Sequence, residues 1–367
     1  MEAYRANSAF PEEWHRLEKI FVNPSLQMVS FTITEKGYSL KGADSAIAIV
    51  CALLYERYKT NQAPIALVSM DNCSHNGEKF KNAVLDVAGE WLEKGSVNEG
   101  FLSYLSDENQ VSFPWTMIDK ITPRPADSVY EDLKHHGVED MKPVITSKKT
   151  YIAPFVNAEA PQYLVIEDNF PNGRPALEKA GVYFTDRETV NKVERMKVTT
   201  CLNPLHTALA VYGCLLGYTS IADEMKDPEL NKLICEIGPI EGMPVVTNPG
   251  ILSPSAFVEE VIHIRFPNPF MPDTPQRIAT DTSQKVGIRY GETIKAYVEK
   301  IRKVRKKLTA IPLAIAGWCR YIMGLNDEGN PFELSPDPML PKLTQTLKGI
   351  EIGNPKSYSG QLKNHSF

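Results

Sequence analysis

The stretch Ala43-Asp-Ser-Ala-Ile-Ala-Ile-Val-Cys-Ala-Leu-Leu-Tyr-Glu-Arg-Tyr58 is followed by the short run Pro64-Ile-Ala-Leu-Val-Ser-Met70. The first segment is long and apolar, as in a buried helix, and the second is short and bounded by turn residues, as in a buried strand. A strand at 27–34 precedes this pair, and a helix at about 78–93 follows it. Strand, helix, strand, helix is typical of a parallel sheet with crossover helices. We therefore expect an α/β N-terminal part built on a parallel sheet.

Helices predominate in the second half of the chain. A helix at 11–22 and a strand at 163–168 complete the first half. From about residue 186, apolar residues recur at helical spacing, which predicts helices at 188–217, 227–237, 254–264, 288–307, 309–324 and 338–349. Since the sequence has no Ser/Gly-rich linker, we predict two domains that pack together. The first is an α/β domain at 1–185, and the second is a mostly α-helical domain at 186–367.

The composition is that of a globular protein. Of the 367 residues, 43% are apolar and 23% are charged, which allows a sizeable core. The net charge of −5 argues against nucleic acid or an anionic membrane surface as the main partner. The sequence has no signal peptide and no apolar run of the roughly 18 residues that a membrane helix needs. The six cysteines include no CxxC pair, which favours reduced thiols. We expect a cytoplasmic protein.

The segment Lys197-Val-Thr-Thr-Cys-Leu-Asn-Pro-Leu-His206 brings together side chains suited to catalysis. A lysine acts as a general base when burial or nearby cations lower its pKa. Asn203 can donate to a developing alkoxide, and His206 can orient a substrate oxygen. Asn203 and His206 share a face on a helix, although Pro204 disfavours a regular helix there. A surface lysine, a capping asparagine and a hydrogen-bonded core histidine explain the same spacing, so spacing alone leaves both interpretations open.

A second candidate is Ser69-Met-Asp-Asn-Cys-Ser-His-Asn-Gly77, at the carboxyl end of the strand at 64–70. In open α/β sheets, ligands bind outside the carboxyl ends of the strands. Asn76 and Gly77 come just before a predicted helix and could donate amide groups to a ligand. A turn with a helix cap is the alternative.

Three charged residues are further candidates. Asp119 lies in the apolar run Thr116-Met-Ile-Asp-Lys-Ile-Thr-Pro123, where a buried acid needs a partner. A salt bridge with Lys120 or another neighbour would supply one. Arg265 and Lys285 suit a polyol or a carboxylate, with ordinary ion pairing as the alternative. Because the seven histidines form neither HxxxH nor HExxH, and no cysteine pair has zinc spacing, we expect no metal site.

Several stretches together resemble one family, the polyol-specific long-chain dehydrogenases, which include mannitol 2-dehydrogenase and the fructuronate and tagaturonate reductases. They are Ser30–Tyr38, Ser69–Gly77, Phe113–Pro123, Ile166–Pro175, Met196–Lys197 with Leu202–His206, and Arg265–Pro269. They occur in the family's order and span nearly the whole chain. The resemblance implies a metal-independent oxidoreductase that transfers a hydride between NAD or NADP and a polyol or ketose. A hexuronate reductase is the nearest alternative.

The resemblance also implies roles for individual residues. Lys197 resembles the general base, Asn76 and Asn203 the amides that stabilise the substrate oxygen, and His206 a substrate-binding histidine. Asp119, Arg265 and Lys285 resemble substrate contacts. The cofactor-binding residues implied by the same comparison are Thr34, Glu35, Ser69, Asn76 and Asp119.

Two departures from the family pattern stand out. In the family the lysine stands five residues before the asparagine, whereas Lys197 stands six before Asn203, and Pro204 replaces a glycine. We expect a π-bulge to absorb the extra residue. The opening βαβ units with the glycine-rich phosphate loop also have no counterpart in this chain, so the resemblance implies that residues 1–185 form a partial Rossmann-like dinucleotide-binding domain. We therefore expect poor NAD binding by this chain alone and self-association through an exposed sheet edge. An inactive fragment that serves as an assembly module is the alternative to an enzyme.

Overall fold

The computed structural model describes residues 10–362, apart from 40, 41, 43, 44, 123, 147, 148, 150, 272 and 301–307. Its contacts divide the chain into two compact units. Unit 1 comprises Met1–Lys120 and Gln162–Glu194, and unit 2 comprises Ile121–Pro161 and Arg195–Phe367. The chain thus crosses from unit 1 to unit 2, returns, and crosses again near Glu194. The predicted division at residue 185 places 121–161 with the first half, whereas the contacts group this segment with unit 2.

Unit 1 contains the predicted parallel sheet. Its strands are β1 (Met28–Phe31), β2 (Ile65–Ser69) and β3 (Val111–Ser112), in the order β1-β2-β3. β1 and β2 run parallel with Met28 opposite Ala66, and β2 and β3 run parallel with Ile65 opposite Val111. All five residues of β2 are buried, as its continuous apolar sequence predicts for a central strand.

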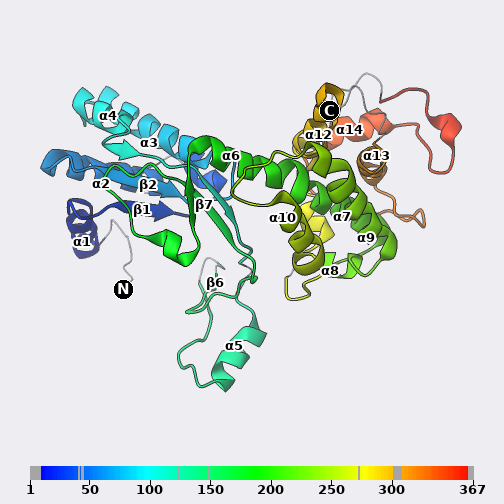
Figure 1. Cartoon of the computed structure of the whole chain (residues 1–367), viewed down its shortest axis with the longest axis horizontal. Helices are drawn as coiled ribbons and strands as arrows, with labels where there is room; N and C mark the ends of the chain where they lie inside the picture. Colours follow the sequence, from blue (N-terminus) through cyan, green and yellow to red (C-terminus); the bar gives the residue numbers. More distant parts are fainter. Residues whose placement is uncertain are drawn as a thin grey trace. The chain divides into compact units, whose positions relative to one another are not determined.

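The helices of unit 1 lie beside this sheet and share its hydrophobic core (Figure 1). They are α1 (Pro11–Phe21), α2 (Ala46–Thr60), α3 (Asn76–Glu93) and α4 (Glu99–Ser106). The side chain of Ser45 caps α2 by accepting a hydrogen bond from the Ala48 N–H at 3.2 Å. Leu54 of α2, Phe80 of α3 and Phe101 of α4 are fully buried in one hydrophobic core. The predicted helices and strands of this region are confirmed, so unit 1 has the expected α/β fold.

A smaller sheet continues unit 1. It consists of β4 (Thr116–Asp119), β7 (Tyr163–Glu167) and β8 (Tyr183–Thr185), with β4 antiparallel and β8 parallel to β7. The Thr116 hydroxyl donates to the carbonyl of Ser69 at 2.7 Å, which ties the start of β4 to the carboxyl end of β2. The predicted strand at 163–168 is therefore present as β7, and it carries the chain beside β4.

Unit 2 is mostly helical, as predicted. Its helices are α5 (Asp127–His135), α7 (Asn203–Leu216), α8 (Ile221–Glu224), α9 (Pro228–Cys235), α10 (Pro254–Glu260), α11 (Pro275–Ile278), α12 (Glu292–Lys300), α13 (Ala310–Ile322) and α14 (Leu340–Leu347), and its one described hairpin joins β5 (Val144–Ile145) to β6 (Tyr151–Ile152). α7 is the central helix, with α9, α11 and α13 packed against it. Residues 301–307 of the predicted helix at 288–307 lie outside the described residues.

Four segments of unit 2 wind as π-helices. They are Lys197–Cys201, Glu236–Gly242, Val261–Arg265 and Gly287–Gly291. The prediction of one continuous helix at 188–217 is therefore wrong: α6 (Arg187–Met196) passes into the first π-helix, and α7 begins at Asn203. Pro204 explains the break, because its ring has no N–H to continue the hydrogen-bond pattern of the preceding turn.

All six cysteines are free thiols, and burial raises the pKa of Cys51 and Cys201 to about 12. Such thiols stay protonated and unreactive near neutral pH. Among the described residues, no helix combines the length and the apolar character required to cross a lipid bilayer.

Candidate active site

The π-helix at Lys197–Cys201 is the local structure that carries the predicted catalytic lysine. The Leu202 N–H donates to the carbonyl of Lys197 at 3.1 Å, five residues back rather than four. This wide turn takes up one additional residue before α7 begins, which is the π-bulge expected from the six-residue spacing between Lys197 and Asn203. Lys197 itself is buried, with 2% of its surface exposed.

Two side chains from the segment after position 286 donate hydrogen bonds to backbone carbonyl groups in and next to this turn. Tyr290, which is buried, donates its hydroxyl to the carbonyl of Pro204 at 2.7 Å, and Thr293 donates to the carbonyl of Thr199 at 3.1 Å. An irregular helical turn leaves carbonyl groups without their usual partners, and such groups are costly to bury unpaired. The two hydroxyls therefore stabilise the turn that carries Lys197.

Asn203 is the first residue of α7. Its side chain is half-buried and makes no hydrogen bond with any residue that the structure describes. The N-terminal end of a helix carries partial positive charge, which favours a negatively charged oxygen nearby. An amide donor at this end of α7 is suited to stabilising a developing oxyanion.

His206 lies in the first turn of α7, beside an aspartate that the sequence did not suggest. Its Nε2 atom lies 2.9 Å from Oδ2 of Asp273, and both side chains are largely buried. The imidazole also packs against the ring of Phe266, with 5.0 Å between centroids. Burial alone would raise the pKa of Asp273, but His206 and Arg277 outweigh burial and hold this pKa below its ordinary value. Asp273 is therefore an ionised partner that fixes the orientation of His206.

A second acid lies buried near this pair. Glu224 has no exposed surface, and neither of its carboxyl oxygens has a hydrogen-bond partner among the described residues. Burial, reinforced by the charge of Asp273, raises the pKa of Glu224 to about 9. Glu224 is thus a neutral carboxylic acid near pH 7. Its carboxyl group occupies the space beside Gly213, where any Cβ would collide with it.

In unit 1, a hydrogen-bond network occupies the carboxyl ends of β1 and β2. Asp71 accepts the N–H groups of Ile33 at 3.1 Å and Thr34 at 2.8 Å. The Tyr38 hydroxyl lies 2.6 Å from both the Asp71 carboxylate and the Ser69 hydroxyl. This network holds Thr34 at φ 63°, a left-handed conformation that costs a β-branched residue energy. Sequence reasoning named Thr34 and Ser69 but missed Asp71, the residue that organises them.

The loop after β1 presents exposed polar groups at this edge of the sheet. Thr34 and Glu35 are both exposed, and Glu35 forms an ion pair with Lys79. Ser69, in contrast, is fully buried. A polar, exposed loop at the carboxyl ends of parallel strands is the usual place for a dinucleotide in an α/β sheet.

Asn76 and Asp119 are both buried in unit 1. The Asn76 amide nitrogen lies 2.9 Å from the carbonyl of Asp71 and 2.8 Å from the Thr116 hydroxyl, and its oxygen accepts the Thr116 N–H at 3.0 Å. These contacts tie the N-terminus of α3 to β4. Asp119 ends β4, directly opposite Tyr163.

Arg265 and Lys285 occupy different environments in unit 2. Arg265 forms a buried, two-pronged ion pair with Glu159, at 3.0 Å from Nε and 2.8 Å from Nη2. Lys285 donates to the carbonyl of Thr280 at 2.5 Å. Burial and the nearby Arg289 lower the pKa of Lys285. Arg265 therefore has the ion-pair partner that was the alternative to a substrate contact.

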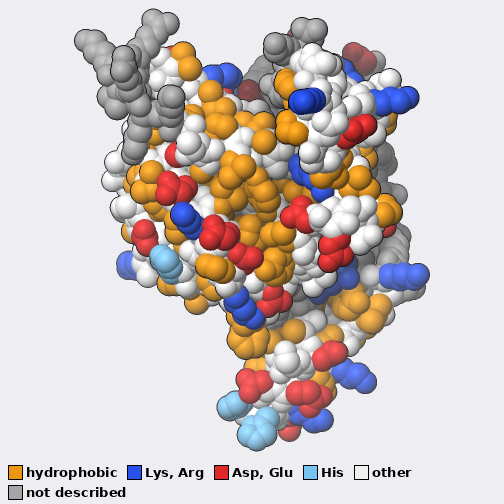
Figure 2. All heavy atoms as spheres, turned by 90° about the vertical axis from the view of Figure 1, so that its right-hand side faces the viewer, with side chains coloured by type: hydrophobic (Ala, Val, Ile, Leu, Met, Phe, Trp, Pro, Cys, Tyr) orange, Lys and Arg blue, Asp and Glu red, His pale blue; other side chains and the backbone are white. Residues whose placement is uncertain are grey.

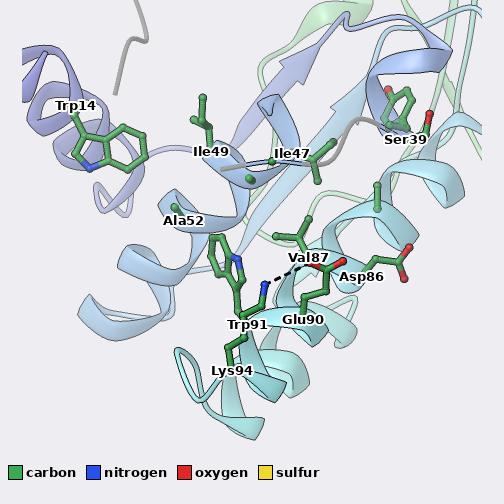
Figure 3. A pocket seen from close by; sticks show the side chains of 14 residues that line it. Trp14, Ser39, Ile47, Ile49, Ala52, Asp86, Val87, Glu90, Trp91 and Lys94 are labelled. Carbon is green, nitrogen blue, oxygen red and sulfur yellow. Dashed lines mark ion pairs between the residues drawn. The ribbon is translucent and has the colours of Figure 1, made fainter. Parts of the chain in front are cut away.

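Two cavities, one in each unit, are lined by none of Lys197, Asn203 and His206. In unit 1, a cavity of about 670 Å³ lies among α1, α2 and α3. Figure 3 shows Trp14, Ile47 and Trp91 around it, with Glu90 and Lys94 paired at 3.9 Å. Its walls are mainly apolar, with Asp86, Glu90 and Lys94 as the charged groups, and it contains none of the residues predicted to be catalytic.

A second cavity, of about 660 Å³, lies in unit 2. α13 and α14 line it with apolar side chains such as Ile315, Met323 and Leu347. Figure 2 shows hydrophobic side chains gathered across the middle of the face that is turned to the viewer. Within the described residues, no group of three or more His, Cys, Asp or Glu side chains is arranged to hold a metal ion.

Comparison with known proteins decides the family. Residues 4–179 match the model of the mannitol dehydrogenase Rossmann domain, and residues 189–362 match that of the mannitol dehydrogenase C-terminal domain. The chain belongs to the mannitol dehydrogenase family. The family resemblance read from the sequence motifs is thereby confirmed, as is the fold class.

Two curated members of the family illustrate its range. The chain is 54% identical to the D-mannonate oxidoreductase of Thermotoga maritima, over 99% of this chain and 70% of that protein. It is 30% identical to mannitol dehydrogenase DSF1 of Saccharomyces cerevisiae, over 91% of this chain and 65% of that protein. The chain thus spans about two thirds of the length of these relatives.

Two solved structures of family members share its fold. One is D-sorbitol dehydrogenase in substrate-free form, with a TM-score of 0.74 and 27% identity, covering 90% of this chain and 66% of that one. The other is the Pseudomonas fluorescens mannitol 2-dehydrogenase in complex with NAD and D-mannitol. Its TM-score is 0.63 and its identity 25%, covering 91% of this chain and 66% of that one.

Proposed function

We propose that this chain forms part of an NAD(P)-dependent oxidoreductase that interconverts a sugar acid such as D-mannonate and its keto acid. The observation that carries the chemistry is the buried Lys197 on a braced π-turn immediately before Asn203 and His206. The substrate class follows the 54% identity to a D-mannonate oxidoreductase. A mannitol-type polyol dehydrogenase is the second candidate, and the 30% identity to a yeast mannitol dehydrogenase favours it.

Three residues of unit 2, Lys197, Asn203 and His206, have separate roles in the oxidation of the alcohol. Lys197 accepts the proton of the hydroxyl group as its carbon gives up a hydride. Asn203 and the N-terminal end of α7 stabilise the oxygen as negative charge develops on it. His206, oriented by Asp273, donates to or accepts from a neighbouring substrate hydroxyl. Reduction of the ketone uses the same groups in reverse.

A nicotinamide dinucleotide supplies the hydride acceptor in this reaction. The carboxyl ends of β1 and β2 fit such a cofactor, since Thr34 and Glu35 expose polar groups there and Asp71 holds the loop in place. We assign Thr34 and Glu35 to cofactor binding on this basis. Ser69 is fully buried beside Tyr38, so its proposed part in cofactor binding is to hold this loop in place.

Asn76 and Asp119 retain proposed roles of a different kind. For Asn76 to donate to a substrate oxygen, one of its N–H groups must leave Thr116 or Asp71. We propose that Asn76 chiefly holds the N-terminus of α3, with donation to the substrate oxygen as its second role. Asp119, at the end of β4, is proposed to lie near the nicotinamide and the substrate.

Dinucleotide reduction by the full-length protein tests this proposal. We expect turnover with D-mannonate, and loss of turnover by about a hundredfold or more in Lys197→Gln, because proton transfer to a positioned base contributes about 10²–10⁴. Lys192→Gln removes an exposed lysine of α6 that pairs with Glu188 and serves as the control. Full activity of Lys197→Gln removes Lys197 as the base. Turnover of D-mannitol in place of D-mannonate selects the second candidate.

We also propose self-association through the edge of the parallel sheet. β1 pairs with β2 on one side, and no other described strand pairs with it. An open strand edge invites pairing with another chain. Ser30→Lys, at an exposed position of β1, should then reduce the mass measured by light scattering to that of a monomer. A monomeric parent protein contradicts the proposal.

A further inference from the structure

Two cations of unit 2 lie one helical turn apart. The Arg289 N–H donates to the carbonyl of Lys285 at 2.9 Å, so the two side chains leave the same face of this turn. Both residues are half-buried. Burial lowers the pKa of Arg289 to about 10, and burial together with Arg289 lowers that of Lys285.

Neither cation, Lys285 or Arg289, forms an ion pair with a carboxylate oxygen within the described part of the chain. Two carboxylates act on Lys285 from beyond ion-pair distance. They are Asp281, which is exposed, and Asp337, which accepts the N–H and hydroxyl of Ser283. Two adjacent, partly desolvated positive charges that lack an ion-pair partner are costly. Such an arrangement is typical of a site that receives an anion.

Arg289 also reaches the turn that carries the candidate catalytic residues. Its Nη1 atom donates to the Thr207 hydroxyl at 2.5 Å, and that hydroxyl donates to the carbonyl of Asn203 at 2.9 Å. Thr207 directly follows His206. The guanidinium group is therefore held at the residue that follows His206 in the chain. Through the Thr207 hydroxyl it is also linked to Asn203, the first residue of α7. One N–H group donates to Thr207, and no other residue that the structure describes accepts a hydrogen bond from this side chain, so its other N–H groups can serve a ligand.

The chemistry of the two cations indicates the ligand. A guanidinium group binds a carboxylate through two parallel N–H···O bonds, and a nearby ammonium adds a point charge. A neutral polyol offers hydroxyl groups, which would leave both charges uncompensated. Arg265, the other arginine considered for this task, is already paired with Glu159.

We propose that Arg289, with Lys285 beside it, binds the carboxylate of the sugar-acid substrate and so selects sugar acids over neutral polyols. This inference rests on the proposed oxidoreductase function. It adds Arg289, which no sequence motif suggested, as a specificity-determining residue.

The experiment compares D-mannonate with D-mannitol in the full-length protein and in Arg289→Gln. We expect the KM for D-mannonate to rise about tenfold to hundredfold, which is the loss of one charge-assisted hydrogen-bonded pair. The rate constant at saturation and the activity with D-mannitol should change little. Arg289→Lys keeps the positive charge but loses the parallel N–H groups of the guanidinium. Its KM for D-mannonate should therefore lie between the values of the parent protein and of Arg289→Gln. Lys295→Gln removes an exposed cation of α12, paired with Glu292, and is the matched control.

A binding measurement separates this role from a structural one. D-mannonate should raise the thermal midpoint of the parent protein and not that of Arg289→Gln. A structural arginine would instead lower the midpoint of the variant without ligand, whereas removing an uncompensated buried charge should leave it equal or higher. If Arg289→Gln does not fold, Lys285→Gln enters the same assays with the same expected rise in KM.

The possible failures are distinguishable. An unchanged D-mannonate KM in folded Arg289→Gln overturns the carboxylate assignment and leaves the oxidoreductase function intact. Equal losses with D-mannonate and D-mannitol also overturn it, because a carboxylate contact affects one substrate alone. A parent protein that oxidises neither compound overturns the proposed function itself, and the present inference with it.

Discussion

The Nε2 atom of His206 lies 2.9 Å from Oδ2 of Asp273, across 67 residues of chain that include α8, α9 and α10. This contact joins the first turn of α7 to the residues just before α11. It leaves Nδ1 as the second imidazole nitrogen available to a ligand, and it makes the orientation of His206 depend on a carboxylate that is itself shared with Arg277.

Replacement of this carboxylate should impair catalysis more than folding. In Asp273→Asn, the histidine loses its charged partner, and we expect kcat/KM to fall about tenfold or more, since removing one partner of a buried hydrogen-bonded group costs about 1–3 kcal/mol. The pH dependence of kcat/KM should shift as well. Asp223→Asn, which alters an exposed aspartate paired with Lys226, is the control. A parent-like kcat/KM in Asp273→Asn would show that the contact does not orient His206 for catalysis.

Glu224 should make stability depend on pH. Its pKa is raised from 4.5 to about 9 in the folded chain, so the folded state keeps a proton that the unfolded state loses above about pH 4.5. Stability should therefore fall as pH rises between these values, by at most about 1.4 kcal/mol for each pH unit. Glu224→Gln cannot ionise, and its thermal midpoint should exceed that of the parent protein at pH 8 but not at pH 5. If the thermal midpoints of Glu224→Gln and the parent protein differ by the same amount at both pH values, the prediction is wrong. Glu229→Gln, at an exposed position, is the control.

Loss of the Tyr290 hydroxyl should loosen the π-turn. Tyr290→Phe leaves the buried carbonyl of Pro204 without its donor, so we expect about 1–3 kcal/mol less stability in urea unfolding. Because this carbonyl follows Asn203 directly, kcat should fall as well. Tyr358→Phe removes an exposed hydroxyl and should change neither quantity. If kcat survives the loss of stability, the brace serves folding alone.

The buried pair of Arg265 and Glu159 gives a test of structure against substrate binding. Glu159→Gln should cost about 3–5 kcal/mol, because it leaves Arg265 buried without its counter-ion. Replacing both residues by methionine should restore much of this stability. If activity returns together with stability, Arg265 is structural. Restored stability without activity would identify Arg265 as the substrate contact suggested by the family motif.

The sequence predicted the elements whose signal is local. The continuous apolar runs of α2 and β2 could be assigned from periodicity and length, because burial of whole segments leaves a direct trace in composition. The π-turn at Lys197 was also accessible, since one residue too many between Lys197 and Asn203 must be absorbed somewhere.

The residues that complete the site left no such trace. Asp273 follows a proline-rich stretch and looks like a turn residue, and Glu224 reads as an ordinary acid in a short helix. Arg289 lies before a run of charged residues that suggests an exposed helix. Each of the three contacts a residue more than ten positions away in the chain. Asp273 contacts His206, Glu224 contacts Gly213, and Arg289 contacts Thr207. Single-sequence patterns record spacing along a helix or strand and do not record such pairings.

The place of Glu224 beside Gly213 has a consequence for variation in this family. Even a methyl group at position 213 would take the volume of the carboxyl group, so the two positions are sterically interlocked. A protein with alanine at 213 would have to place a shorter side chain at 224, and the proton stored near the His206–Asp273 pair would go with it. Exchange of a single hydrogen atom for a methyl group on α7 would thus act as an electrostatic change, although no charged residue had been mutated.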